Sequence, residues 1–259
     1  MSATLLLLIG GAILGLALSF AVVPAGSRGV FNPANAASVN DLARIVVGLL
    51  PKALALAGLL AGIRFVHHKP MRCVFTDGRP FRVGFAVQSA LLWAVLWFAG
   101  ILVQPQGWER LAARAVEISP AWWPILSAFL FAAVAVAVSL EEVLFRGYLQ
   151  PRIGAWVKRP WMAVGITALV FTGVHRGGSL AAYAAIAFGA VLLGTAGIRT
   201  GTLAPLLGMH AMHDTLEVLW HPGETNAGAT WLDAVVWVVG LSIWFGWLLW
   251  CGGRDKWCP

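Results

Sequence analysis

Apolar runs of about 20 residues recur along the whole chain, from a first run near residue 4 to a last run that ends near residue 251. A helix of that length crosses the hydrocarbon core of a bilayer, so such runs are typical of membrane-spanning helices. Only 11% of the 259 residues are charged and 59% are hydrophobic, whereas a soluble domain carries about 25% charged residues. The sequence therefore predicts an all-α integral membrane protein.

The apolar runs predict a bundle of eight transmembrane helices. Their approximate ranges are 4–25, 43–65, 82–103, 122–150, 161–179, 180–198, 202–220 and 231–251. The fourth range is long enough to continue past the bilayer as an amphipathic extension. The first range lacks a basic opening and is longer than the apolar region of a typical signal peptide, so we expect a membrane anchor. Since no repeat or linker divides the chain, we predict a single polytopic membrane domain over residues 1–259.

Basic residues predict the orientation of the bundle, because lysine and arginine collect in cytoplasmic connections. They concentrate after the second, fourth, sixth and eighth ranges, at Arg64, Lys69, Arg72, Arg79, Arg82, Arg152, Lys158, Arg159, Arg199, Arg254 and Lys256. We therefore expect both termini to face the cytoplasm, in a cell membrane of bacterial or archaeal type. The bias accounts for the net charge of +7, so the lipid bilayer is an expected partner and nucleic acid is not. The stretch HHKPMRC (67–73) is expected to be a basic loop on anionic headgroups in preference to a metal site.

The three cysteines are Cys73, Cys251 and Cys258. Their odd number and their predicted places, on the cytoplasmic side or in the last span, argue against a disulfide framework and against a thiolate zinc site. None is near the histidines in the predicted spans, so a cysteine nucleophile is not expected.

Ionisable side chains lie within three of the predicted spans, where they usually face a bundle interior or a wet cavity and indicate function by default. They are Glu141, Glu142, Arg146, His175, His210, His213, Asp214 and Glu217. Counted from the cytoplasmic helix ends at 1.5 Å per residue, Glu141 lies about 14 Å deep, His175 about 21 Å and His210 about 12 Å. Three helices thus bring polar groups to a similar depth, which predicts an intramembrane cavity.

Helix geometry separates the two adjacent glutamates, because neighbouring residues point about 100° apart. Glu142 and Arg146 have the i, i+4 spacing of an ion pair. Glu141 has no such partner on its own helix, and an unpaired, desolvated carboxylate suits a general base. We therefore predict that Glu141 is the base and that Glu142 is structural.

The seventh span offers two candidate pairs at the same spacing. His210 and Asp214 are four residues apart, and so are His213 and Glu217. One pair is expected to face the site and the other to brace neighbouring helices, but spacing alone does not choose between them. His175 lies among small residues in FTGVHRGG, which leaves room for a cavity.

Three motifs follow one another on successive apolar segments: EEVLFRG fits EExxxR, FTGVH fits FxxxH and HAMHD fits HxxxN/D. In this order and spacing the chain resembles the CPBP family, the CAAX-prenyl endopeptidases and bacteriocin-processing (Abi) intramembrane proteins, over a motif-bearing core of about residues 122–220. The resemblance selects His210 over His213 in the third motif, where Asp214 stands in a position characteristically occupied by Asn in the prenyl endopeptidases. It implies catalytic Glu141, His175, His210 and Asp214, with Glu142, Arg146 and Phe171 as the other motif positions.

The mechanism that this resemblance implies is glutamate-dependent peptide hydrolysis without a cofactor. Glu141 and His175 activate a water, and His210, held by Asp214, stabilises the oxyanion, a contribution of about 3–4 kcal/mol per donor. The implied substrate is a membrane-associated or lipid-anchored peptide or protein.

Three other interpretations stay open. Glu141, His175 and His210 make a conceivable Glu/His/His zinc set for a metalloprotease, although no HExxH motif is present. Glutamate and histidine also serve as proton relays in transporters, but the inverted repeats of such proteins are not found. A catalytically silent immunity or interaction protein is the last alternative, and the complete set of motif residues argues against it.

Overall fold

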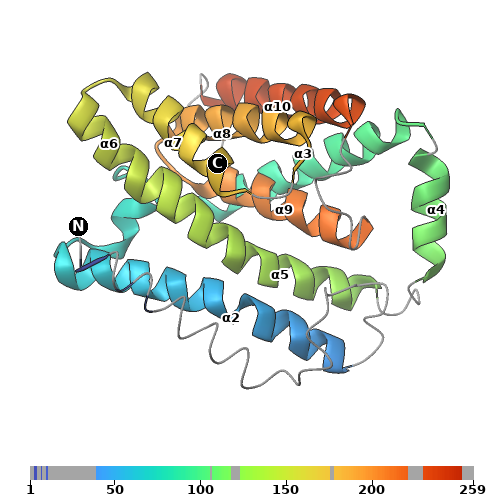
Figure 1. Ribbon diagram of the computed structural model, residues 1–259, viewed down its shortest axis with the longest axis horizontal. Coiled ribbons are helices and arrows are strands. Elements are labelled where there is room, and N and C mark those ends of the chain that lie inside the picture. Colours follow the sequence, from blue (N-terminus) through green and yellow to red (C-terminus); the bar gives the residue numbers. More distant parts are fainter. Residues whose placement is uncertain are drawn as a thin grey trace. The chain divides into compact units, whose positions relative to one another are not determined.

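The computed structural model describes residues 3, 4, 7, 10, 39–105, 107–117, 123–175, 178–220 and 230–252. These residues are mainly helical (Figure 1). β-Structure in the described ranges is limited to one isolated bridge, between Thr76 and Thr202, so the predicted all-α class is confirmed. The helices in chain order are α2 (Val39–Ala61), the π-helix η3 (Gly62–Val66), the 3₁₀ helix η4 (Met71–Val74), α3 (Val83–Leu102), α4 (Gly107–Glu117), α5 (Trp123–Glu142), the π-helix η5 (Val143–Leu149), α6 (Gln150–Val157), α7 (Pro160–Val174), α8 (Leu180–Thr200), α9 (Ala204–Trp220) and α10 (Trp231–Gly252).

Five described helical segments are long and apolar enough to cross a membrane: Leu49–Val66, Val83–Leu102, Ser127–Val157, Leu180–Thr200 and Trp231–Cys251. They correspond to five of the eight predicted spans and establish an integral membrane protein. The predicted spans 161–179 and 202–220 correspond to shorter helices, α7 with 15 residues and α9 with 17. The predicted span 4–25 lies almost entirely outside the described residues.

The fourth predicted span is longer than a single membrane crossing requires, as the sequence indicated. Helix continues from α5 through η5 into α6 and ends where Lys158 adopts a left-handed backbone conformation with φ of 56°. The π-helical turn begins directly after Glu142, and π-helical turns are frequent at functional sites. Gly147 in this turn faces the carbonyl group of Val74 so closely that a Cβ atom there would clash with it.

The chain forms two compact units, each built from segments that are distant in sequence. Unit 1 contains the described residues within Met1–Cys73, Leu111–Glu141 and Asp214–Gly223. Its apolar core includes Leu130 of α5 and Leu219 of α9, with Leu49 of α2 packed against them. Near the other end of the α2–η3 segment, Thr4 Oγ1 and His67 Nε2 form a hydrogen bond of 2.9 Å.

Unit 2 contains the described residues within Val74–Arg110, Glu142–His213 and Glu224–Pro259. Helix α8 packs against α7 and α10, and α10 also packs against α3 (Figure 1). A buried chain of hydrogen bonds connects α10, α3 and α9, since Trp244 Nε1 donates to Ser89 Oγ at 2.7 Å and Ser89 Oγ donates to the Pro205 carbonyl at 2.7 Å. A side chain at Gly208 would clash with the Ala86 backbone, so glycine permits the close approach of α9 to α3.

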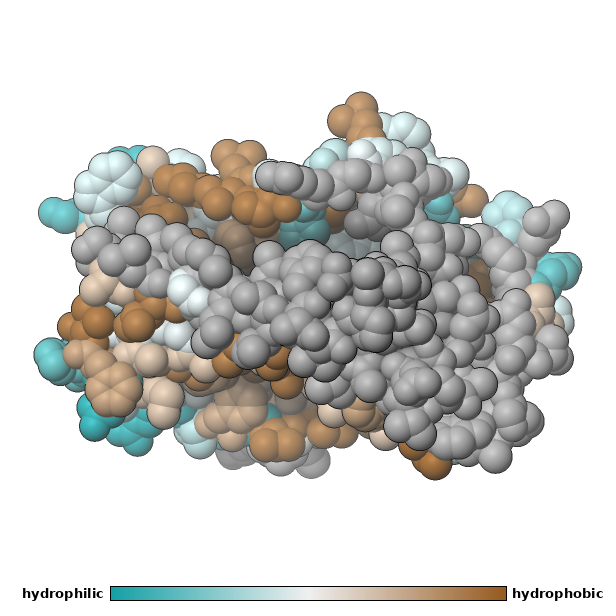
Figure 2. Space-filling model, turned by 60° about the horizontal axis from the view of Figure 1, so that its bottom comes forward, coloured by the Kyte–Doolittle hydropathy of each residue, from teal (hydrophilic) through white to brown (hydrophobic). Residues whose placement is uncertain are grey.

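Large hydrophobic side chains are exposed along the candidate spans, and Figure 2 shows such brown side chains at the surface of the described residues. They include Val87, Leu91 and Val95 on α3, and Val235, Val239 and Ile243 on α10. A soluble protein rarely exposes extended apolar surface, whereas lipid tails cover such residues at no cost. The surface therefore agrees with a location in the bilayer.

Candidate active site

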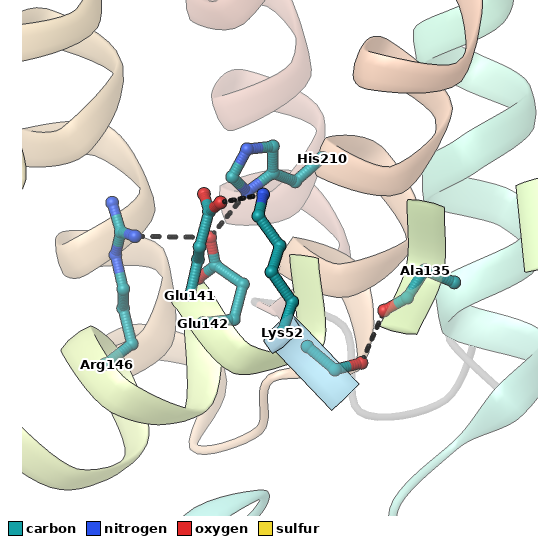
Figure 3. A network of polar contacts seen from close by, with 7 residues as sticks. Lys52, Ala135, Glu141, Glu142, Arg146 and His210 are labelled. Carbon is teal, nitrogen blue, oxygen red and sulfur yellow. Dashed lines mark hydrogen bonds and ion pairs between the residues drawn. The ribbon is translucent and has the colours of Figure 1, made fainter. Parts of the chain in front are cut away.

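Glu142, the last residue of α5, is the centre of a buried polar cluster in unit 2. Its side chain has no exposed surface. Arg146 Nη1 donates a hydrogen bond to Glu142 Oε1 at 3.2 Å, and His210 Nδ1 donates to the same oxygen at 2.7 Å (Figure 3). The predicted i, i+4 pair of Glu142 and Arg146 is confirmed. The other carboxylate oxygen of Glu142, Oε2, is buried and has no hydrogen-bond partner among the described residues.

Arg146 contacts Glu142 and an aromatic ring. Its side chain is 2% exposed, and its guanidinium carbon lies 4.3 Å from the ring centroid of Phe171 on α7. A guanidinium over an aromatic face is stabilised by the ring quadrupole, and more so when water is excluded. Carboxylate and ring together compensate a positive charge that would otherwise be costly to bury.

His210 projects from α9 and is buried. Because a carboxylate oxygen can only accept, the proton in the 2.7 Å bond to Glu142 Oε1 is on His210 Nδ1. The second nitrogen, Nε2, therefore accepts a hydrogen bond when the ring is neutral and donates one when the ring is an imidazolium. Glu142 thus fixes both the orientation and the tautomer of His210.

His175 lies directly after the end of α7, where the backbone becomes extended with φ of −77° and ψ of 125°. Its Nδ1 donates to the carbonyl of Phe171 at 2.7 Å, and its own carbonyl accepts a bond of 3.0 Å from the Tyr183 hydroxyl. These bonds hold the half-buried ring at the helix terminus and make Nε2 the acceptor nitrogen of its neutral form.

The Phe171 ring lies close to one side chain from each of the three motifs. Its ring centroid lies 4.5 Å from that of His175 and 6.4 Å from that of His210, and its face contacts Arg146. Phe145 packs edge-on against it at 5.0 Å. Unit 2 therefore gathers Arg146 of η5, His175 at the end of α7 and His210 of α9 around one buried aromatic ring.

Glu141 belongs to unit 1, and its contacts differ from those of Glu142. Lys52 Nζ on α2 donates to Glu141 Oε1 at 3.1 Å (Figure 3). The interpretation of Glu141 as an unpaired carboxylate is therefore wrong. Helical spacing detects partners on the same helix, whereas this partner lies 89 residues earlier in the chain. Glu141 is 21% exposed, whereas Glu142 exposes nothing.

The other ionisable residues of the seventh predicted span have different surroundings from His210. The His213 ring lies 5.6 Å from the Trp93 ring and 5.5 Å from the Trp237 ring, centroid to centroid. Asp214 and Glu217 follow on α9 as half-buried residues in unit 1. The two histidines thus contact different groups, His210 a carboxylate and His213 two indoles.

A zinc site requires several histidine, cysteine or carboxylate side chains close together. The described ranges contain no group of three or more histidine, cysteine, aspartate or glutamate side chains that is close enough to hold a metal ion. Cys73 is exposed and Cys251 is buried, both as free thiols, and Cys258 lies outside the described residues.

The buried cluster is built from residues of the three motifs, in a chain whose helices are long and apolar enough to cross a membrane. Residues 118–216 match the family model described as type II CAAX prenyl endopeptidase Rce1-like. This match includes all three motifs and confirms the resemblance to the CAAX-prenyl endopeptidases, so it supports a protease of the CAAX type. No curated protein and no solved structure matches the chain.

Lys52 contacts the candidate catalytic residue Glu141, although no sequence motif includes it. Lys52 lies inside the predicted span 43–65 and inside the observed segment Leu49–Val66. The sequence did contain a signal, because a lysine within a predicted span is as unusual as a glutamate or a histidine there. The spacing of residues along one helix could not predict the contacts of Phe171, since the side chains that pack against its ring come from different helical segments.

Proposed function

We propose that this protein is an intramembrane endopeptidase that hydrolyses a peptide bond of a membrane-associated or lipid-anchored protein or peptide, with a water activated by glutamate. The observation that supports this most is the clustering of Glu142, Arg146, His175 and His210 around Phe171. All are positions of the three motifs in the part of the chain that matches the CAAX endopeptidase model. An arrangement of this kind is not needed to stabilise a helix bundle, because buried ionic groups are weak stabilisers.

Glu141 is the proposed general base, together with His175. The motif position and the exposure of the two glutamates support this choice, since a base must reach water and Glu141 is the less buried of the two. Glu141 takes a proton from the water while the water oxygen attacks the scissile carbonyl carbon. When the carbon–nitrogen bond breaks, the same proton passes to the leaving amine, which returns Glu141 to its ionised form.

His210 is the proposed donor to the oxyanion that forms during this attack. Its Nδ1 proton is engaged by Glu142, so the donated proton is that of Nε2 in the imidazolium form, with the Glu142 carboxylate as its counter-charge. A preorganised donor of this kind contributes about 3–4 kcal/mol to transition-state stabilisation. Asp214, one helical turn further along α9, is proposed to support His210 as the second residue of the third motif.

The membrane arrangement that fits this chemistry is a bundle of eight spans with both termini in the cytoplasm and a cavity open to that side. The concentration of basic residues after alternate spans supports this orientation. Candidate substrates are a prenylated CAAX tail, a leader peptide or a C-terminal sorting tag.

The test is a comparison of membrane-protein termini in the native host with the wild-type chain and with Glu141→Gln. The variant is expected to abolish every cleavage that depends on the protein, because an amide nitrogen cannot accept the proton of the water, while its melting temperature stays that of the wild type. Glu109→Gln, at an exposed position of α4, makes the same chemical change elsewhere and should leave cleavage unchanged. Identical termini from the wild type and Glu141→Gln would refute the proposal.

A further inference from the structure

Lys52 is an ionisable residue inside a candidate membrane span that none of the three motifs includes. It lies in α2, within the apolar segment Leu49–Val66. Ionisable groups within apolar spans are rare, and in membrane proteins they usually mark functional sites. The residue before it, Pro51, stands in the helix interior, where it removes a backbone hydrogen bond and allows the helix to bend.

The Lys52 ammonium contacts Glu141, a candidate catalytic residue. Lys52 Nζ lies 3.1 Å from Glu141 Oε1, in a pair formed between α2 and α5 within unit 1 (Figure 3). An ammonium donates up to three hydrogen bonds, and it interacts with a carboxylate as a compact charge on a flexible chain. One oxygen of Glu141, Oε1, is therefore engaged by Lys52.

We propose that Lys52 is a positioning residue for Glu141, in an inference that rests on the proposed role of Glu141 as the base. The ammonium holds Oε1 in one place, and this fixes the rotamer of the side chain and the direction of Oε2. It also places a positive charge directly beside the Glu141 carboxylate. Lys52 itself does not touch the reacting atoms.

A positioning role and a structural role differ in what they predict for Lys52 variants. Half of the Lys52 side chain is exposed, at 49%, and exposed ion pairs add little to stability. Loss of the ammonium is therefore expected to change turnover and to leave the fold almost unaffected. Misplacement of a catalytic group by about 1 Å lowers the rate by as much as about a hundredfold, and substrate affinity does not depend on it.

The experiment measures kcat, KM and melting temperature for the full chain in lipid vesicles, with a peptide identified by the termini comparison. Lys52→Met is expected to lower kcat by about ten- to a hundredfold with KM within about twofold. Lys52→Arg retains a cation of similar length and should restore most of the lost turnover. Lys52→Gln is a second uncharged variant, with a polar side chain in place of the apolar one of methionine, and it should also lower kcat. Arg64→Met removes an exposed cation from the adjoining helix η3 and should behave as the wild type.

The outcomes separate the two proposals. If Glu141→Gln retains activity, the proposed base is wrong. If Glu141→Gln is inactive while Lys52→Met and Lys52→Gln keep the wild-type kcat, the base stands and the positioning role is refuted. Lys52→Met could instead lose activity together with a lower melting temperature, with no recovery in Lys52→Arg. That result would show a structural role for Lys52 and would also overturn the inference.

Discussion

Replacement of Glu142 tests the buried cluster through protein stability. Its carboxylate is fully buried and accepts hydrogen bonds from Arg146 and His210. Glu142→Ala removes the counter-charge of an arginine whose side chain is 2% exposed, and breaking a buried pair in this way costs about 3–5 kcal/mol. Glu142→Gln keeps one oxygen acceptor, so the expected loss is smaller, about 1.5–3 kcal/mol, the scale of a hydrogen bond to a charged group.

The assay is reversible unfolding in mixed micelles by titration with a denaturing detergent, which gives the free energy of unfolding of each variant. Glu142→Leu combined with Arg146→Met removes both charges and should recover much of the loss, because an apolar replacement of a buried pair is often neutral. Asp77→Asn is the control, because it weakens the exposed 3.6 Å pair with Arg79 and should cost no more than about 1 kcal/mol. A Glu142→Ala loss no larger than that of the control would refute the buried cluster.

Three further predictions concern the histidines, the metal and the close approach at Gly147. His210→Ala is expected to remove turnover while substrate still binds, since the oxyanion contact forms in the transition state. His213→Ala should keep substantial activity and lower stability, because it removes the ring contacts with Trp93 and Trp237. The reverse pattern would move the site to His213. Active protein is expected to contain no stoichiometric zinc by elemental analysis, and loss of activity on stripping with recovery on zinc return would contradict this. Gly147→Ala is expected to lower the free energy of unfolding by about 1–3 kcal/mol, because its Cβ would meet the Val74 carbonyl, and an unchanged value would show that the π-helical turn accommodates a side chain.

Local spacing was sufficient for the features that depend on a single helix. The apolar runs identified the five segments now seen as candidate spans, because a bilayer requires about 20 apolar residues per crossing. The i, i+4 rule identified the pair of Glu142 and Arg146, since residues at that spacing lie on one helical face. The order of the three motifs identified the region that matches the family model, because all three motifs lie within residues 118–216.

Contacts between helices were decided by the tertiary structure alone. Spacing gave Glu141 no partner, and the structure pairs it with Lys52 from α2. The bond of His210 Nδ1 on α9 to Glu142 at the end of α5 is a second contact between helices that spacing along either helix could not predict. The reason is physical: periodicity along one helix reports which residues share a face, but the rotation and axial shift of each helix against its neighbours depend on the packing of the assembled side chains. Those shifts determine which carboxylate an imidazole or an ammonium can reach.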